Sequence, residues 1–234
     1  FLSLRWSSFV SSMKYADLCA FYRHRDIDRC HLSPSIPTTI MMPACNQRLF
    51  SSYSQSPVKC YDISFIGHYE NDGRDLIAQQ LFLNGLDTHI FSSRKWRAIR
   101  ARKRHGYFMH DPVFGEGYTN AILSSRLLLC FFSSLNCDLY TRRVFEAAAL
   151  GVPVICLYNS AIAEIFENNY EIVLCRSVDE IVVKACQLVA NPARCTAIGE
   201  MARERSIRCG YSLESRSRAL IDYWLTLNPS VSSV

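Results

Sequence analysis

The segment LLLCFFSSLNCDLYTRRVFEAAALGVPVICL, residues 127–157, contains a complete strand–helix–strand pattern. Its two ends, residues 127–132 and 153–157, are short runs with apolar side chains at successive positions, as expected of strands buried on both faces. Between them, residues 144–150 form an almost wholly apolar helical stretch. This stretch ends before Gly151, where a left-handed residue commonly terminates a helix. The pattern predicts two buried strands joined by a helix.

The same alternation of strands and helices extends from Tyr61 onward. Segments with apolar residues three to four positions apart, typical of helices, separate most of the short apolar or β-branched runs. Strands that alternate with helices over about 150 residues indicate an α/β fold, a doubly wound parallel sheet with helices on both faces. The additional predicted strands are residues 62–67, 88–92, 106–110 and 172–175.

The limits of two helices near the carboxyl terminus are also predicted by local signals. Ser177 and Glu180 form a capping box before an apolar run. Asn191 and Pro192 suit the cap and the first residue of the next helix. A final helix is predicted over residues 213–227 from its one-sided apolar pattern.

The first 58 residues have a different pattern. Two short strands, residues 16–22 and 38–42, flank a charged stretch, which is too little structure to bury a core alone. We therefore predict that residues 1–58 are the remnant of a preceding domain, with serine-rich residues 51–57 as a linker. Residues 59–234, final helix included, are predicted to form the second domain.

The composition excludes several classes of protein. With 49% hydrophobic and 20% charged residues the chain is typical of soluble globular proteins, and no apolar run reaches the roughly 18 residues of a membrane span. Eleven cysteines without a Cys-x-x-Cys pair predict small buried side chains in a reducing compartment, the cytoplasm. The net charge of +5 suits anionic small molecules without requiring nucleic acid. The chain begins with Phe1, which indicates a fragment or a processed product.

The predicted topology also predicts the place of a ligand site. In a doubly wound sheet of order 3-2-1-4-5-6, ligands bind in the crevice outside the carboxyl ends of strands one and four. Two loops face this crevice here, residues 67–74 and residues 133–141. Candidate binding residues are therefore expected in these loops and in the helix that follows the second one.

Glu146 is the only charged residue in the apolar stretch 144–150. A buried carboxylate without partners costs several kcal/mol, so something must satisfy it. One interpretation is a carboxylate that accepts hydrogen bonds from vicinal sugar hydroxyls, such as those of a nucleotide ribose. In the other interpretation, Glu146 lies on the exposed surface of the helix or pairs with Arg143.

Asp138 lies eight positions before Glu146, near the amino end of the same helix. This helix end exposes N–H groups and the positive end of the helix dipole, which together can bind a diphosphate. Thr141 adds a hydroxyl, and Arg142 and Arg143 add positive charge. The alternative for Asp138 is that it simply caps the helix.

The loop after the first strand offers two further candidates. Arg74 is predicted to clamp a diphosphate from the opposite wall of the crevice, with an exposed helix-start arginine as the alternative. His68 is predicted to contact phosphate or sugar. The loop contains only Gly67 and Gly73 and matches neither the dinucleotide-binding glycine motif nor the phosphate loop of NTPases. Both of those classes therefore lose support.

Residues 61–225 resemble the carboxy-terminal domain of two-Rossmann-domain (GT-B) glycosyltransferases. They are most similar to the CgeB-like, or spore-maturation-protein-like, branch of the group 1 transferases. The resemblance depends on short blocks in a shared order and spacing rather than on any single motif. These blocks are residues 62–67 (DISFIG), Trp96, residues 115–118 (GEGY), residues 125–129 (SRLLL), residues 138–153 and Asn191-Pro192.

The resemblance implies roles for the two acidic residues. In that family the first acid of a Glu-x7-Glu motif lies near the transferred sugar and the second binds the nucleotide ribose. Asp138 and Glu146 match these positions, which makes Asp138 the implied catalytic residue. Backbone amides of Tyr140, Thr141 and Arg142 match the segment that meets the diphosphate. This sequence departs from the commoner motif by an aspartate in the first position and by the lack of glycines in between.

The implied reaction is transfer of a sugar from a UDP- or GDP-linked donor to an unknown acceptor, with retention of configuration and without cofactor or metal. No Asp-x-Asp occurs, and the six histidines show no metal-ligand spacing. Such enzymes need an amino-terminal Rossmann domain, which only residues 1–58 could represent. The chain is therefore predicted to bind donor weakly and to be inactive alone.

Two other functions stay open. One is a non-catalytic nucleotide-binding or scaffold module of the same fold. The other is nucleic-acid binding through residues 94–105, which carry seven Lys or Arg residues around Trp96. A solvated helix and loop between two strands explains that segment better, so nucleic acid is disfavoured as a partner.

Overall fold

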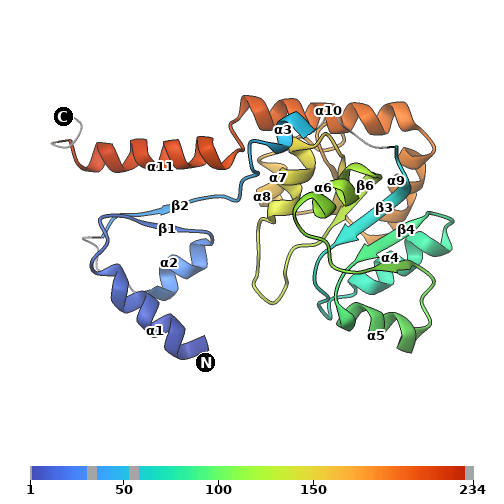
Figure 1. Cartoon of the computed structure of the whole chain (residues 1–234), viewed down its shortest axis with the longest axis horizontal. Helices are drawn as coiled ribbons and strands as arrows, with labels where there is room; N and C mark the ends of the chain where they lie inside the picture. Colours follow the sequence, from blue (N-terminus) through green and yellow to red (C-terminus); the bar gives the residue numbers. More distant parts are fainter. Residues whose placement is uncertain (1, 31–35, 53–57, 230–234) are drawn as a thin grey trace. The chain divides into compact units, whose positions relative to one another are not determined.

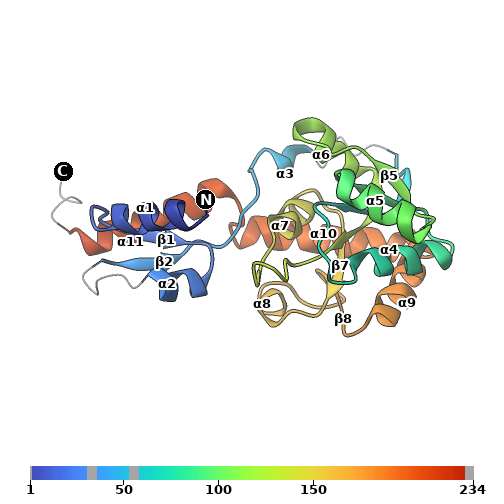
Figure 2. The ribbon, with the colours of Figure 1, turned by 90° about the horizontal axis from the view of Figure 1, so that it is seen from below.

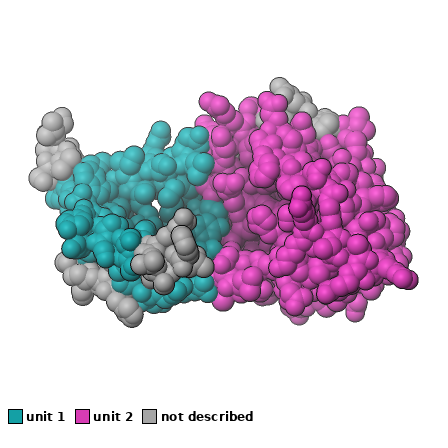
Figure 3. All heavy atoms as spheres, turned by 60° about the horizontal axis from the view of Figure 1, so that its bottom comes forward, with its two compact units in different colours: residues 1–43, 213–234 teal, residues 44–212 magenta. Residues whose placement is uncertain are grey.

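A computed structural model describes residues 2–30, 36–52 and 58–229 of the chain and divides it into two compact units (Figure 3). Unit 1 comprises residues 1–43 and 213–234, and unit 2 comprises residues 44–212. This division differs from the predicted boundary at residue 58. The final helix groups with the amino-terminal segment, and the predicted linker residues 53–57 lie outside the described residues.

Unit 2 is built on a six-stranded sheet in which every neighbouring pair of strands is parallel. The spatial order is β5-β4-β3-β6-β7-β8, which is 3-2-1-4-5-6 counted within the unit (Figure 1). The predicted doubly wound sheet is therefore confirmed, with strand limits shifted by at most two residues. The strands are β3 (Tyr61–Ile66), β4 (Thr88–Phe91), β5 (Phe108–His110), β6 (Ser125–Cys130), β7 (Val154–Leu157) and β8 (Val173–Cys175).

Helices cover both faces of this sheet. One group packs over the main core, where the side chains of Phe65, Leu127 and Ile155 are buried and Trp96 is completely enclosed. This group is α4 (Arg74–Leu83), α5 (Arg94–Lys103) and α9 (Val178–Val189), seen together in Figures 1 and 2. On the other face, α6 (Gly115–Leu123) and α7 (Arg142–Ala149) pack against the central strands. Three further helices, α3 (Leu49–Ser52), α8 (Ser160–Ala163) and α10 (Pro192–Arg208), complete unit 2.

The predicted helix ends follow their local signals. Ser177 accepts a hydrogen bond from the backbone N–H of Glu180. Asn191 likewise caps α10, with Pro192 in its first turn. Gly151 has a φ of 67°, the left-handed conformation that permits the chain to leave α7 and enter β7.

Unit 1 contains a small βαβ arrangement. Strand β1 (Cys19–Phe21) pairs in parallel with β2 (Thr38–Ile40), and α2 (His24–Cys30) connects them. Helix α1 (Leu2–Met13) was missed by the sequence analysis because its five serines weaken the apolar pattern. Helix α11 (Leu213–Leu227) completes the unit. The predicted strands are confirmed but shorter, and the charged stretch forms α2.

All eleven cysteines lie in the described part of the chain, and none forms a disulfide. Seven are buried, as predicted, whereas Cys60, Cys137 and Cys209 are exposed. In residues 2–30, 36–52 and 58–229, no helix combines the length and the apolar character that crossing a bilayer requires.

Candidate functional site

The topological switch point of the sheet lies between β3 and β6. These strands are hydrogen-bonded neighbours, and the chain proceeds from them in opposite directions, to β4 and to β7. The loops at their carboxyl ends, residues 67–73 and 131–141, lead directly into α4 and α7. The two strand ends to which the sequence analysis assigned the crevice are therefore neighbours, and both belong to unit 2.

Glu70 joins the two crevice loops. Its Oε2 accepts hydrogen bonds from the backbone N–H of Ser134 at 3.0 Å, from the Ser134 hydroxyl at 3.2 Å and from the N–H of Leu135 at 3.4 Å. Burial opposes ionisation, but hydrogen bonds from Ser133 and Leu135 and the charge of Arg74 outweigh it and hold the Glu70 pKa below its usual range. Sequence analysis missed this residue because its partners lie 64 positions away.

The guanidinium of Arg74 is hydrogen-bonded within the loop that precedes α4. Its guanidinium donates to both carboxylate oxygens of Asp72, at 2.8 and 2.6 Å, and to the carbonyl of His68 at 2.8 Å. Glu70 lies 3.4 Å away, and only 4% of the arginine side chain is exposed. The alternative of an exposed helix-start arginine is therefore wrong. These bonds give no support to the predicted diphosphate clamp, because they hold the donors of Arg74 within the loop.

Arg143 extends from the first turn of α7 onto the end of β3. A Cβ atom at Gly67 would lie 2.8 Å from its Nη2, so the guanidinium rests directly on the Gly67 backbone. Within the described residues its one side-chain hydrogen bond is a long contact of 3.3 Å to the Thr141 hydroxyl. Its Cζ lies 5.9 Å from the centre of the Phe65 ring. A half-buried cation with spare donors thus lies between the first strand and α7.

Thr141 is the N-cap residue of α7, with an extended backbone and no side-chain cap hydrogen bond. The interpretation of Asp138 as the cap is therefore wrong. The first N–H groups of a helix have no intrahelical acceptors, so this end of α7 presents donors beside Arg143. Asp138 itself is partly exposed on the preceding loop, where its N–H donates to the carbonyl of Ser133 at 2.9 Å.

Glu146 lies one turn further along α7, with 8% of the residue exposed. Its Oε2 accepts a hydrogen bond of 2.5 Å from the hydroxyl of Tyr118, and its Oε1 pairs with Nε of Arg142 at 2.9 Å. The ion-pair partner is thus Arg142 and not Arg143, which the sequence analysis had considered. The Arg142 side chain is 69% exposed, so this pair lies on the surface side of the helix.

Tyr118, which the sequence analysis noted only as part of a family block, contacts the candidate site through Glu146. It belongs to the first turn of α6, and burial followed by the charge of Glu146 raises its pKa well above the usual range. The charge of Arg143 lowers the pKa of the same phenol, so Tyr118 interacts electrostatically with the cation that lies against Gly67.

The structure thus brings together five of the predicted residues, from the end of β3 and the first two turns of α7. Of the other four, Arg74 begins α4, and the remaining three lie on the two loops: His68 is exposed, and Asp138 and Tyr140 are partly exposed before α7. The loop after β7 contacts the loop after β6: the side-chain amide of Asn159 donates to the carbonyl of Leu139 at 3.1 Å. The five residues brought together are Gly67, Thr141, Arg142, Arg143 and Glu146.

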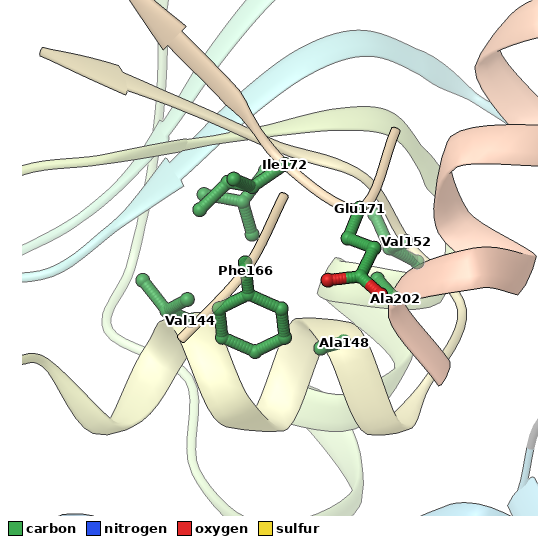
Figure 4. A pocket seen from close by; sticks show the side chains of 8 residues that line it. Val144, Ala148, Val152, Phe166, Glu171, Ile172 and Ala202 are labelled. Atoms are coloured by element: carbon green, nitrogen blue, oxygen red, sulfur yellow. The ribbon is translucent and has the colours of Figure 1, made fainter. Parts of the chain in front are cut away.

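A small cavity lies on the other side of α7 (Figure 4). It is lined mainly by apolar side chains, among them Val144, Ala148 and Phe166, with Glu171 at its edge. It does not admit a water molecule. Val144 and Ala148 lie on the face of the helix opposite Glu146, so this cavity is a packing gap and not part of the candidate site.

Much of the basic segment 94–105 is held within the protein. Lys103 pairs at 2.6 Å with Asp75, which is 1% exposed, and His105 contacts the same carboxylate at 3.1 Å. Arg97 pairs with Asp111 at 2.7 Å, and Arg100 donates to the carbonyl of Tyr107 at 2.6 Å. These partners weaken the interpretation of the segment as a nucleic-acid interface.

The fold is that of GT-B glycosyltransferases. Sucrose-phosphate synthase from Thermosynechococcus elongatus superposes with a TM-score of 0.68 at 13% identity, over 97% of this chain and 62% of that protein. HepE from Anabaena, solved with UDP-glucose, gives 0.70 at 12% identity, over 100% and 69%. A glycosyltransferase from Rickettsia africae gives 0.65 at 12%, over 92% and 66%. The chain therefore spans about two thirds of the length of these structures or slightly less.

The family follows from the sequence itself. Residues 74–222 match the glycosyl transferase-like family, and the chain belongs to it. A search of curated proteins found no match. The family assignment does not reach the CgeB-like branch, which stays a prediction.

Proposed function

We propose that this protein is a glycosyltransferase that takes its sugar from a UDP- or GDP-linked donor, and that unit 2 binds the donor. The observation that carries the proposal is the arrangement along α7. The helix presents its first N–H groups and the cation of Arg143 at the Gly67 end of β3, and one turn later it presents the buried carboxylate of Glu146. A diphosphate and its ribose need these two kinds of partner in this order.

In the proposed mechanism, negative charge develops on the diphosphate as the sugar leaves. Donors that are already oriented toward that charge stabilise the transition state without reorganisation. Arg143 and the N–H groups of α7 supply them, so we propose that transfer does not depend on a metal ion. Thr141 adds a hydroxyl at the same helix end.

By resemblance, we assign the contact with the transferred sugar to Asp138, on the loop that precedes α7. A carboxylate there would stabilise the cationic character of the sugar in the transition state. We further propose retention of the anomeric configuration and membership of the CgeB-like branch. The acceptor is open, and catalytic turnover is proposed for the protein as a whole, since this chain spans 62% of the sucrose-phosphate synthase.

Two observations support the proposed class of donor and the proposed cellular compartment. HepE is described in complex with UDP-glucose, and this chain shares its fold. The eleven cysteines are all free, which suits the proposed cytoplasmic, reducing environment.

The proposal is tested by calorimetric titration of this chain with UDP, UDP-glucose, GDP and GDP-mannose. Glu146→Ala is expected to weaken binding of the preferred nucleotide by about 10–100-fold, because it removes charge-assisted bonds to the ribose. The matched control is Glu180→Ala, whose carboxylate caps α9 away from the crevice. Unchanged affinity in Glu146→Ala would remove this residue from the site. Binding without sugar transfer by the complete protein would favour the non-catalytic module.

A further inference from the structure

Tyr118 connects two helices that are far apart in the sequence. It lies in the first turn of α6, which follows β5, whereas its partner Glu146 lies in α7, which follows β6. The phenol donates to Glu146 Oε2 at 2.5 Å, a short charge-assisted hydrogen bond. Burial, followed by the charge of Glu146, raises the pKa of Tyr118, so the phenol keeps its proton and donates this hydrogen bond.

The two oxygens of Glu146 therefore have different surroundings. Oε2 is held by Tyr118, while Oε1 contacts Nε of Arg142, whose side chain is 69% exposed. Because the guanidinium of this pair is largely exposed, it can leave Oε1 for water when a ligand arrives. Oε1 is thus the oxygen available to a ligand, and the hydrogen bond from Tyr118 determines its direction.

We propose that Tyr118 is a positioning residue for donor recognition: its phenol orients the Glu146 carboxylate so that Oε1 accepts from the ribose hydroxyls of the nucleotide. This inference rests on the proposed function, because it takes Glu146 as the ribose ligand. Removing the phenol leaves a buried carboxylate oxygen without its donor, so the carboxylate turns or pairs more closely with Arg142. In either case the ribose loses a preoriented acceptor.

The test compares Tyr118→Phe with wild type by titration with UDP and 2′-deoxy-UDP. Wild type is expected to prefer UDP by about tenfold, the value of one charge-assisted hydrogen bond. In Tyr118→Phe the affinity for UDP is expected to fall about 5–20-fold while that for 2′-deoxy-UDP falls much less, so the preference disappears. Equal losses for both nucleotides, or no loss, would overturn the proposal.

A double-mutant cycle separates positioning from a general effect on folding. If Tyr118 acts through Glu146, Tyr118→Phe is expected to cause no further loss of UDP affinity in the Glu146→Ala background. Additive losses would overturn the proposal. The matched control is Tyr107→Phe, which removes a fully buried phenol that has no hydrogen-bond partner within the described residues. It is expected to keep the preference for UDP.

The outcomes also distinguish this inference from the function on which it rests. If wild type binds UDP and 2′-deoxy-UDP equally, Glu146 is not the ribose ligand and the proposed donor site fails. If wild type prefers UDP and Tyr118→Phe retains that preference, the donor site stands and the positioning role of Tyr118 is wrong.

Discussion

Arg74 and Arg143 lie in the first turns of α4 and α7, the helices that follow β3 and β6, yet their side chains have opposite environments. Arg74 is 4% exposed and donates to Asp72 and to the carbonyl of His68. Arg143 is half-buried and, in the part of the chain that the structure describes, its side chain makes one long hydrogen bond, to Thr141. An arginine at the expected position of a fold therefore need not be able to bind a ligand. Its N–H donors must also remain without internal hydrogen bonds in the folded protein.

The cause of the difference lies in the neighbouring residues. Two acids of the loop before α4, Glu70 and Asp72, turn toward Arg74. The acid nearest to Arg143 along α7 is Glu146, which is already bonded to Tyr118 and Arg142. Arg143 therefore keeps donors for an external anion, whereas those of Arg74 stabilise the loop.

The largest expected effect is on stability. Arg74→Ala leaves the partly buried carboxylates of Asp72 and Glu70 without their cation, and we expect a loss of about 3 kcal/mol in the free energy of unfolding. Urea denaturation followed by circular dichroism measures it. A variant as stable as wild type that no longer binds UDP would restore Arg74 as the diphosphate clamp and break the comparison.

The next effect is on binding. Arg143→Ala is expected to weaken UDP affinity by about 10–100-fold with little change in stability, because charge-assisted contacts to the diphosphate are lost while few internal bonds are. Titration calorimetry measures this loss. Arg97→Ala, which removes a half-exposed arginine of α5, is the matched control and should bind UDP as wild type does. An Arg143→Ala variant with normal affinity would contradict the assignment.

The smallest effect concerns Glu70 and its dependence on pH. Because the folded-state pKa of Glu70 is lowered, its contribution to stability is present above the ordinary glutamate pKa and is lost as pH falls through the lower folded value. Glu70→Gln is therefore expected to be about 1 kcal/mol less stable than wild type at pH 7. At a pH below the folded-state pKa this difference should vanish. A difference that stays constant with pH would show that the charge of Glu70 does not hold the loops together.

The parts of the fold that were predicted depend on local patterns. Apolar runs such as residues 127–132 and caps such as Ser177 act within a few positions, so the strand order and the crevice could be inferred from them. Helix α1 was missed for the same reason, since its serines give no local pattern. The place of α11 in unit 1 was also missed, because nothing within the helix specifies which part of the chain it joins.

Local sequence patterns were enough to establish that the chain is α/β and which two strands meet at the switch point of the sheet. The packed structure was needed to show which arginine keeps unpaired donors, and that Tyr118 and Glu70 lie beside the predicted residues. The physical reason is separation along the chain: Tyr118 meets Glu146 across 28 positions and Glu70 meets Ser134 across 64. Contacts of this kind exist only once the sheet has brought its loops together.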